Sequence, residues 1–479
     1  MKKVIVVGAG MAGLAAAYYL EKARQVDPSV DYLLLEQDRR TGGKILTERS
    51  GNFVIEGGPD CFLAEKPAVF RLSRELGIYH ELLGTTEKNK GTYVFSGGRV
   101  HRLPEGLMLM VPTKIIPFAF SPLISWPGKL RMGLDLILPR RRGEGDESLA
   151  GFVTRRLGRE ALDKIAEPLI GGIHAGDPEE MSIQASFPRF LEMEEKYGSL
   201  IRAMLAARKQ PKRSGTGKPG SPRITYFMSF QKGLGQLTGE VAGRLDPEKV
   251  RLDCRVAGVA REDDGSYRVK LASGEILKAQ GVILAIPAYE ASRVIGDQDP
   301  LAGELLARIP AASSATITLS YKKSAFPRPL EGFGLLVPQV ENRKIMAITY
   351  TSRKWQYRPA AGEEDVLLRV FIGGARNQHL VTLDEERLLR LVQDELKSIL
   401  GISAQPGFYR CYRWVRGMPQ YTLGHLERMD VIRQRISLYP GLYLIGASYD
   451  GVGIPNCIEA GNRAVEEALI YLGKRAKGL

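Results

Sequence analysis

Cysteine and histidine are scarce in this sequence of 479 residues, which contains four cysteines and five histidines. The cysteines lie far apart, at positions 61, 254, 411 and 457, and none belongs to a C-x-x-C motif. A disulfide framework and a zinc site are therefore not expected. We expect reduced thiols in a cytoplasmic protein instead. No two histidines have the spacing of a metal-dependent hydrolase, so we expect no metal.

Long apolar runs are also lacking. No stretch reaches the roughly 18 uninterrupted apolar residues of a transmembrane helix, so no such helix is expected. The first twenty residues resemble a signal peptide, but their regularly spaced glycines indicate another purpose. With 44% hydrophobic and 25% charged residues, the composition excludes a disordered chain, a collagen or a coiled-coil rod.

Positive charge and glycine are in excess. The 68 Lys and Arg outnumber the 54 Asp and Glu by 14, which favours acidic ligands or anionic surfaces. Nine cations lie in the segments 140–142 and 208–223, which we interpret as solvated loops or contacts with anionic lipid. No nucleic-acid partner is expected. The 53 glycines predict many tight turns or close backbone approaches.

The N-terminal residues have the pattern of a dinucleotide-binding unit. Residues 4–7 predict a buried parallel strand and residues 14–24 predict a helix, with a G-x-G-x-x-G motif between them. Its three glycines allow a tight turn, approach of a pyrophosphate to the backbone, and close packing of helix and strand. The phosphates would lie at the helix N-terminus. The loop residues expected to bind are Gly8, Ala9, Gly10, Met11, Ala12 and Gly13.

An acidic residue ends the second predicted strand, residues 32–35. Glu36 lies 23 positions beyond Gly13 and is followed by Gln37. A carboxylate here accepts hydrogen bonds from a ribose diol and repels a 2′-phosphate, so FAD or NAD is expected and NADP is not.

Two further segments separate FAD from NAD. The run Arg40-Thr41-Gly42-Gly43-Lys44 resembles the flavin-containing amine oxidase superfamily. Near the other end, a predicted strand at 442–445 precedes Gly446, Val452, Gly453 and Ile454, and a helix follows. This resembles the closing motif of the superfamily, in which the helix N-terminus faces the flavin and stabilises the negative charge of its reduced form. We therefore expect non-covalent FAD.

The resemblance implies an α/β (α+β) fold with a Rossmann-like FAD-binding domain of the amine-oxidase/p-hydroxybenzoate-hydroxylase type. This domain is expected to be discontinuous, formed by residues 1–75, 225–289 and 440–479. Residues 290–439 are expected to form a substrate-binding domain with a mixed sheet, since they contain strand-like runs at 315–321, 334–338, 345–351 and 366–372. Residues 76–224 are expected to form a mainly helical domain.

The stretch from 107 to 128 is mostly apolar, but its four prolines exclude one continuous helix. Three interpretations stay open. It lines an apolar substrate cavity, or it presents a hydrophobic surface to a bilayer, or it packs as ordinary short turns of the core.

Within the superfamily, the sequence resembles the oxygen-dependent protoporphyrinogen oxidases and their bacterial relatives that oxidise coproporphyrinogen III. It looks most like the Gram-positive-type branch. The segments that carry this resemblance are 56–60, 167–177, 182–183, 187–188, 418–421 and 451–458.

This resemblance implies the site. Leu169 and Gly172 would lie at the reactive face of the flavin, Phe333, Gly334 and Leu336 would form another wall, and Lys66 would meet a propionate. His174 is interpreted as structural rather than catalytic. The positions implied to hold FAD, besides the first glycine loop and Glu36, are Gln37, Arg40, Gly42, Gly43, Lys44, Gly57, Gly58, Pro59, Asp60, Val256, Trp414, Gly446, Val452, Gly453 and Ile454.

The implied reaction is oxidation of a porphyrinogen to a porphyrin in haem biosynthesis. Three rounds of hydride transfer to the flavin, each followed by reoxidation with O2 to H2O2, would remove six electrons, and no general base is identified. The choice between coproporphyrinogen and protoporphyrinogen stays open, as do peripheral contact with the cell membrane, hand-over of product to a ferrochelatase, and the oligomeric state.

Two alternatives remain. One is another oxidase or desaturase of the superfamily, although residues 446–449 lack the cysteine that tethers FAD in monoamine oxidases. The other is a binding protein on this fold that has lost its flavin, which the intact glycine loop and Glu36 argue against.

Overall fold

The structure is a computed structural model that describes residues 2–51, 53–86, 91–104, 107–108, 110–112, 114–141, 143, 145–209, 222–355 and 364–476. Most of the basic segment 208–223 lies outside the described residues, as does Arg142, so the interpretation of these cations is not addressed by the structure.

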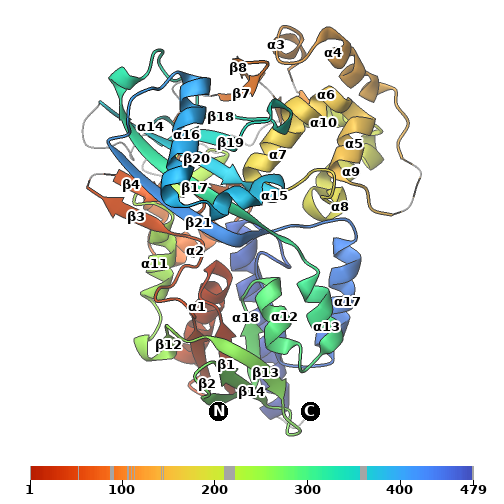
Figure 1. Cartoon of the computed structure of the whole chain (residues 1–479). Helices are drawn as coiled ribbons and strands as arrows, with labels where there is room; N and C mark the ends of the chain where they lie inside the picture. The colour runs from red at the N-terminus through yellow and green to blue at the C-terminus, as the bar shows by residue number, and fades with distance from the viewer. Residues whose placement is uncertain are drawn as a thin grey trace.

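A five-stranded parallel sheet forms the base of the molecule, where both termini lie (Figure 1). Its strands come from three distant parts of the chain because the connections between them hold the other layers. In spatial order they are β12 (Val250–Arg251), β2 (Val30–Leu35), β1 (Lys2–Val7), β16 (Gly281–Leu284) and β22 (Leu442–Leu444).

Two long helices cover one face of this sheet. The side chains of Val4 and Val6 on β1 point toward α1 (Met11–Val26) and α18 (Ile454–Ala476), which pack against each other. At their crossing, a Cβ on Gly461 would lie 2.6 Å from the carbonyl oxygen of Ala12, so only glycine permits this spacing. The N-termini of both helices are thereby brought to the same end of the sheet. The same layer contains α2 (Ala68–Glu75) and α11 (Gly235–Ala242).

The other face of β1 packs against a second layer, since Ile5 and Val7 belong to a separate core cluster. This layer consists of the antiparallel strands β13 (Val256–Arg261), β14 (Tyr267–Leu271) and β15 (Ile276–Ala279) with the helices α12 (Ala288–Ile295), α13 (Pro300–Ala307) and α17 (His425–Ser437).

A seven-stranded mixed sheet lies above this base (Figure 1). One face packs under α16 (Glu385–Leu400), and its other face is turned toward the helical part. Its strands, in order, are β21 (Phe408–Pro419), β17 (Ala311–Lys322), β20 (Asp365–Gly373), β19 (Ile345–Tyr350), β18 (Gly334–Leu336), β7 (Thr92–Ser96) and β8 (Arg99–Arg102). The short helices α14 (Thr351–Lys354) and α15 (Gly374–Asn377) follow β19 and β20.

Two strands of this sheet correct the expected division of the chain. Residues 92–102 were expected within the helical segment 76–224, but they form β7 and β8, and β7 pairs in parallel with β18. The apolar residues Val94 and Phe95 are buried there, so tertiary pairing decides their structure.

Where the structure describes them, residues 114–209 are mainly helical, and this helical part lies at the upper right of Figure 1. Arg156 and Asp135 are fully buried at their centre, where Nε of Arg156 donates to the carboxylate at 2.6 Å. The helices are α3 (Ile115–Ala119), α4 (Trp126–Gly133), α5 (Leu149–Leu157), α6 (Arg159–Ala161), α7 (Glu167–His174), α8 (Ile183–Ser186), α9 (Pro188–Tyr197) and α10 (Leu200–Lys209). A π-helical turn, Leu162–Ala166, joins α6 to α7.

Small antiparallel elements connect the layers. They are the hairpin of β3 (Thr47–Ser50) and β4 (Phe53–Glu56), the sheet of β5 (Phe62–Leu63), β11 (Phe227–Phe230) and β6 (Leu82–Gly84), and the pair of β9 (Leu107–Met108) and β10 (Val111–Pro112).

Candidate functional site

The first glycine loop joins β1 to α1, and its backbone is closely packed. Gly8 has a φ of +97°, and a Cβ on Gly13 would lie 1.8 Å from the carbonyl oxygen of Gly8. Both positions therefore require glycine for packing within the protein.

Gly10 has no such requirement. Its φ of −68° suits any residue, and a Cβ there would meet no protein atom within 4 Å. As the N-cap of α1 it offers no side-chain hydrogen bond, and the first turn of the helix contains no acidic residue. Backbone N–H groups at this helix end are thus available to an anion, and Gly10 leaves open the space that a phosphate needs. This arrangement fits the expected FAD.

Glu36 follows β2 directly beside this loop. Its carboxylate accepts hydrogen bonds from the N–H groups of Ala9, at 2.5 Å, and Asp38, at 3.0 Å. The backbone of Glu36 bonds in turn to Arg251 and Cys254. Val256 begins β13 two residues beyond Cys254, so it lies beside the end of β2, and Gln37 is exposed next to Glu36.

The segment 40–44 docks on the glycine loop. The N–H of Gly42 donates to the carbonyl of Ala9 at 2.8 Å, and a Cβ on Gly43 would lie 3.0 Å from Cα of Gly10. The guanidinium of Arg40 donates to the carbonyls of Thr41, Ile45 and Gly43 and so holds the turn in shape. Burial lowers the pKa of Lys44, whose side chain lies near Cys457 of α18.

The segment 57–60 is fixed by groups from the seven-stranded sheet. The carbonyl of Gly57 accepts from Nε1 of Trp414 at 2.8 Å and from Thr316 at 3.0 Å. Arg369 donates to the carbonyl of Gly58. A Cβ on Gly58 would lie 1.7 Å from the carbonyl oxygen of Lys44, so this segment and 40–44 are in direct contact.

The side chain of Asp60 points away from this contact. It accepts from Nζ of Lys354 at 2.8 Å and from Nε1 of Trp355 at 3.2 Å, next to Cys61. Burial opposes ionisation, but Lys354 and Arg369 hold the pKa of Asp60 well below its usual range. Asp60 therefore anchors the segment that contains Pro59.

The turn between β22 and α18 closes the site. Gly446 has a φ of +119°, and a Cβ there would lie 3.7 Å from the Cβ of Ala12 in α1. Gly451 has a φ of +110° and precedes Val452 and Gly453, after which α18 begins at Ile454. Both helix N-termini and the glycine-rich segments thus converge on one region.

A second set of predicted residues meets between α7 and β18. A Cβ on Gly172 would lie 3.3 Å from Cδ2 of Leu336, and Leu169 and Leu336 pack against the same apolar cluster. Phe333 is half-buried immediately before β18. A Cβ on Gly334 would lie 2.4 Å from the carbonyl oxygen of Ile348, so that glycine is required by strand pairing. The structure therefore brings the residues predicted to contact the substrate together on two facing elements, α7 and the strand β18 with the residue before it. We call the space between these elements the substrate slot.

Two predicted positions lie at the margins. Lys66 is exposed, and its Nζ donates to Oδ1 of Asn456 at 3.0 Å, beside the N-terminus of α18. His174 ends α7 with its ring edge-on to Phe187 at 5.3 Å, and burial lowers its pKa to about 4. The imidazole is therefore neutral at pH 7, as a packing role requires.

A cavity of about 280 Å³ lies between α7 and the ends of β18, β19 and β20. Glu167, Gly171 and Gly172 line one side, and Arg343, Lys344 and Arg376 lie around it. Oε2 of Glu167 accepts from the N–H of Gln339 at 3.0 Å, and burial raises the pKa of this carboxyl to about 7.

Sequence reasoning missed Arg369 and Lys354. Arg369 interrupts an otherwise apolar run that correctly predicted β20. A single charged residue inside such a run was the sequence feature that could have marked Arg369 as functional. Lys354 gave no signal, because its partner Asp60 is 294 residues away in the sequence. Among the described residues, no group of three His, Cys, Asp or Glu is placed to hold a metal.

Comparisons with known proteins show which family the chain belongs to. Residues 11–469 match the family described as flavin containing amine oxidoreductase. The chain is 34% identical to the coproporphyrinogen III oxidase of Bacillus subtilis (strain 168), over 98% of both chains. It is 30% identical to the chloroplastic protoporphyrinogen oxidase of Oryza sativa subsp. japonica, over 98% of this chain and 89% of the relative.

A solved structure agrees. The crystal structure of a protein from Exiguobacterium sp. 255-15, provisionally named a protoporphyrinogen oxidase, superposes with a TM-score of 0.85 and 31% identity, covering 98% of this chain and 99% of that one.

Replacing Gly10 by alanine should separate cofactor binding from folding. The methyl group meets no protein atom, so the melting temperature of the flavin-free protein should stay within about 2 °C of wild type. The same methyl occupies the space of the pyrophosphate, so bound flavin, measured by absorbance near ~450 nm, should fall at least about tenfold. Gly13→Val should lose both flavin and stability. A Gly10→Ala protein with full flavin content would contradict the assignment.

Glu167→Gln should remove a pH dependence of stability. The raised pKa means that the folded state binds more protons than the unfolded state between the ordinary carboxyl pKa and about 7. Wild-type stability should therefore fall, relative to the Gln variant, as pH rises through this window, by up to about 3 kcal/mol. Urea denaturation of both proteins from pH 4.5 to 8 measures the difference, and parallel curves would rule the effect out.

Proposed function

The chain belongs to the flavin-containing amine oxidoreductase family, as its motifs predicted, and we propose that it oxidises a porphyrinogen to the corresponding porphyrin with FAD and O2. The observation that carries this proposal is the extent of the similarity to porphyrinogen oxidases, which spans 98% of this chain. The similarity includes α7 and β18, the two elements that would face the substrate, as well as the shared nucleotide fold.

The residues of this chain would act mainly by positioning. Bound FAD would supply the acceptor for a hydride from the macrocycle and return the electrons to O2. Gly172 leaves room on α7 for a flat ring, while Leu169, Leu336 and Phe333 offer the apolar surface that a macrocycle needs. The N-terminus of α18 would favour negative charge at the near edge of the flavin. None of the described residues is assigned here as a general base.

The substrate is proposed to be coproporphyrinogen III. Its four propionates require more cations at the rim than the two of protoporphyrinogen, and the net charge of +14 agrees with the larger demand. Lys66 is the proposed rim cation, because its ammonium is exposed and lies beside the N-terminus of α18.

We further propose a peripheral contact with an anionic bilayer. The stretch 107–128 does not behave uniformly, since Phe118, Leu123 and Ile124 are buried, whereas Ile116 and Phe120 are 73% and 81% exposed. Exposed apolar side chains also lie on α4 and the turn after it. Because α3 and α4 lie next to each other at the top of Figure 1, we infer that these side chains form one apolar surface. Its members are Ile116, Phe120, Trp126, Leu130, Leu134 and Ile137.

Cations surround this surface. Nζ of Lys129 lies 4.5 Å from the centre of the Trp126 ring, and Lys114 is exposed nearby. Apolar side chains with a tryptophan and flanking lysines suit the interface of an anionic membrane. None of the described helices is both long and apolar enough to cross a bilayer. Delivery of the product to a ferrochelatase stays a prediction, and the oligomeric state stays open.

Aerobic turnover tests the function. Purified protein supplied with coproporphyrinogen III or protoporphyrinogen IX should produce porphyrin fluorescence above the rate of spontaneous oxidation, with O2 consumed, H2O2 formed and no dependence on NAD. The rate should be higher with coproporphyrinogen III. Oxidation of neither porphyrinogen above the rate of heat-inactivated protein would overturn the proposal. H2O2 formed from simple amines instead would favour the amine oxidase alternative.

Lys66→Met should weaken substrate binding. The ammonium would contact a propionate equally in the ground and transition states, so KM should rise roughly tenfold while kcat stays within a few-fold. Lys129→Met, which removes a cation far from the slot, serves as the control. Equal KM values for wild type and Lys66→Met with both porphyrinogens would show that Lys66 is an ordinary surface lysine.

Vesicle binding tests the membrane contact. The double variant Phe120→Asp, Ile137→Asp places two charges on the apolar surface and should reduce sedimentation with phosphatidylglycerol-containing vesicles at least about tenfold. Val26→Asp is the matched control, because Val26 is 87% exposed at the end of α1. Equal sedimentation of both variants with wild type, or no sedimentation of wild type at all, would exclude the contact.

A further inference from the structure

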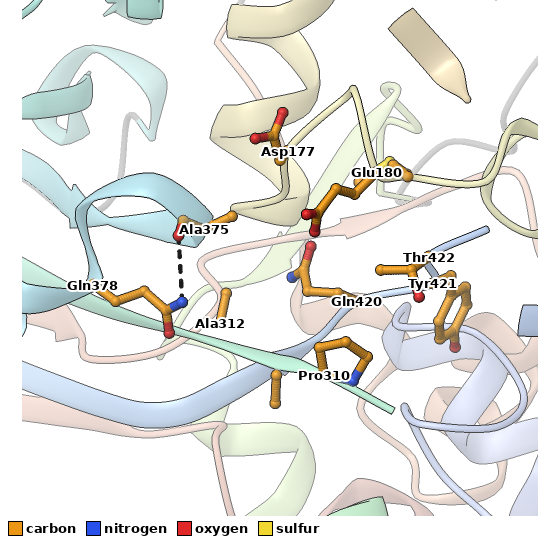
Figure 2. A pocket seen from close by; sticks show the side chains of 11 residues that line it. Asp177, Glu180, Pro310, Ala312, Ala375, Gln378, Gln420, Tyr421 and Thr422 are labelled. Atoms are coloured by element: carbon orange, nitrogen blue, oxygen red, sulfur yellow. Dashed lines mark hydrogen bonds between the residues drawn. The ribbon is translucent and has the colours of Figure 1, made fainter. Parts of the chain in front are cut away.

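A short segment after β21 lies where the three parts of the molecule meet. Gln420 donates its N–H to the carbonyl of Pro310, just before β17, and the carbonyl of Tyr421 accepts from the N–H of Ser182 in the helical part. The two side chains leave this segment in different directions, as Figure 2 shows. Each reaches a different wall of the proposed site.

Tyr421 reaches the turn between β22 and α18. Its hydroxyl donates to the carbonyl of Ala447 at 2.6 Å and accepts from the N–H of Gly451 at 2.9 Å. Burial raises the pKa of Tyr421, so the hydroxyl keeps the proton that it donates. Its ring stacks on His425, with centroids 4.1 Å apart and planes 16° apart. The hydroxyl thus ties Ala447 to Gly451 within the turn that runs from Gly446 to Gly453.

Gln420 reaches the end of α7. Its Nε2 donates to the carbonyls of His174 and Met418, each at 3.0 Å. The carbonyl of His174 belongs to the last turn of the helix, where carbonyls lack partners within the helix. Gly176 makes room for this amide, because a Cβ there would lie 2.5 Å from Oε1 of Gln420. Gln420 therefore fixes the end of the helix that contains Leu169 and Gly172.

A cavity of about 100 Å³ borders the same segment (Figure 2). It is lined by Asp177 and Glu180 from the helical part and by Pro310, Ala312 and Gln378 from the sheet side. The residues that follow α7 therefore border open space, so packing alone does not fill this junction, and the hydrogen bond from Gln420 to His174 helps to hold it.

We propose that Gln420 and Tyr421 are positioning residues that together set the spacing of the substrate slot, Tyr421 by fixing the flavin-facing turn and Gln420 by fixing α7. Because they are consecutive in one extended segment, the distance between the two walls follows from the backbone between them. Neither side chain is proposed to touch the substrate. The part played by Gln420 rests on the proposed function, whereas the part played by Tyr421 requires only that the chain binds FAD.

Tyr421→Phe tests the first half on the holoenzyme. The phenyl ring keeps the stacking with His425 and removes both hydroxyl bonds, so FAD should dissociate on dilution at least about tenfold faster, with a shift of the flavin absorption band. Tyr439→Phe is the matched control, because its hydroxyl donates at 3.1 Å to the carbonyl of Gln298, away from this turn. Dissociation of FAD from Tyr421→Phe at the rate of the control would overturn this half.

Gln420→Met tests the second half. Methionine has a similar length but cannot donate to His174, so KM for the porphyrinogen should rise at least about fivefold while FAD dissociation stays within twofold of wild type. Gln378→Met is the control, since Gln378 borders the same cavity but bonds to Ser313 and Ala375. An unchanged KM would overturn the proposal, and so would equal changes of KM and FAD dissociation in both variants, which indicate only a general loss of structure.

The two halves distinguish this proposal from the proposed function. If wild type oxidises no porphyrinogen, the proposed function is wrong. The part of the present proposal that concerns Gln420 is then wrong as well, because it requires a porphyrinogen substrate. The Tyr421 half is then still decided by FAD dissociation, because this measurement needs no substrate.

Discussion

The close approach of α1 to the end of β1 is the constraint on which the rest of the site depends. Gly13 packs against the carbonyl of Gly8 at a distance that excludes any side chain, so the helix begins immediately after the strand. The backbone N–H groups of its first turn are then left without protein acceptors at a place where Gly10 leaves open space. Packing inside the protein thus creates an anion site without any cationic side chain.

Other parts of the chain are built outward from this point by backbone contacts. The segment 40–44 rests on the glycine loop, and 57–60 rests on 40–44. Trp414 and Arg369 of the seven-stranded sheet then donate hydrogen bonds to the carbonyls of Gly57 and Gly58. Each of these contacts uses a main-chain group. The position of the sheet relative to the glycine loop is therefore limited by the narrow range of donor–acceptor distances in hydrogen bonds. These contacts would connect bound FAD to the wall that would face the substrate.

The sequence predicted those parts of the fold that depend on local patterns. Strand β1, helix α1, strand β2 and helix α18 were all predicted from runs of apolar residues and glycines, and the predicted α/β class is confirmed. The contact between Arg369 and Gly58 joins residues 311 positions apart, which no periodicity reveals. Strands β7 and β8 were missed because β7 pairs with β18, a partner distant in sequence, and β8 joins the sheet only through its pairing with β7. Among the proposed site residues, Gly172 and Leu336 came from resemblance, and only the fold brings them together.

The charge states around α7 follow from its burial and suit an apolar macrocycle. Burial lowers the pKa of His174 to about 4 and raises that of Glu167 to about 7, so both shifts favour the neutral form. At pH 7 the ring of His174 is then neutral and the carboxyl of Glu167 is about half ionised, so the two ends of α7 carry less charge than exposed groups would. Cations such as Lys66 lie instead at the exposed margin. Cations at the margin would then orient a substrate by the carboxylates at the edge of its ring. The apolar centre of the ring, where hydride transfer would take place, would lie between apolar side chains.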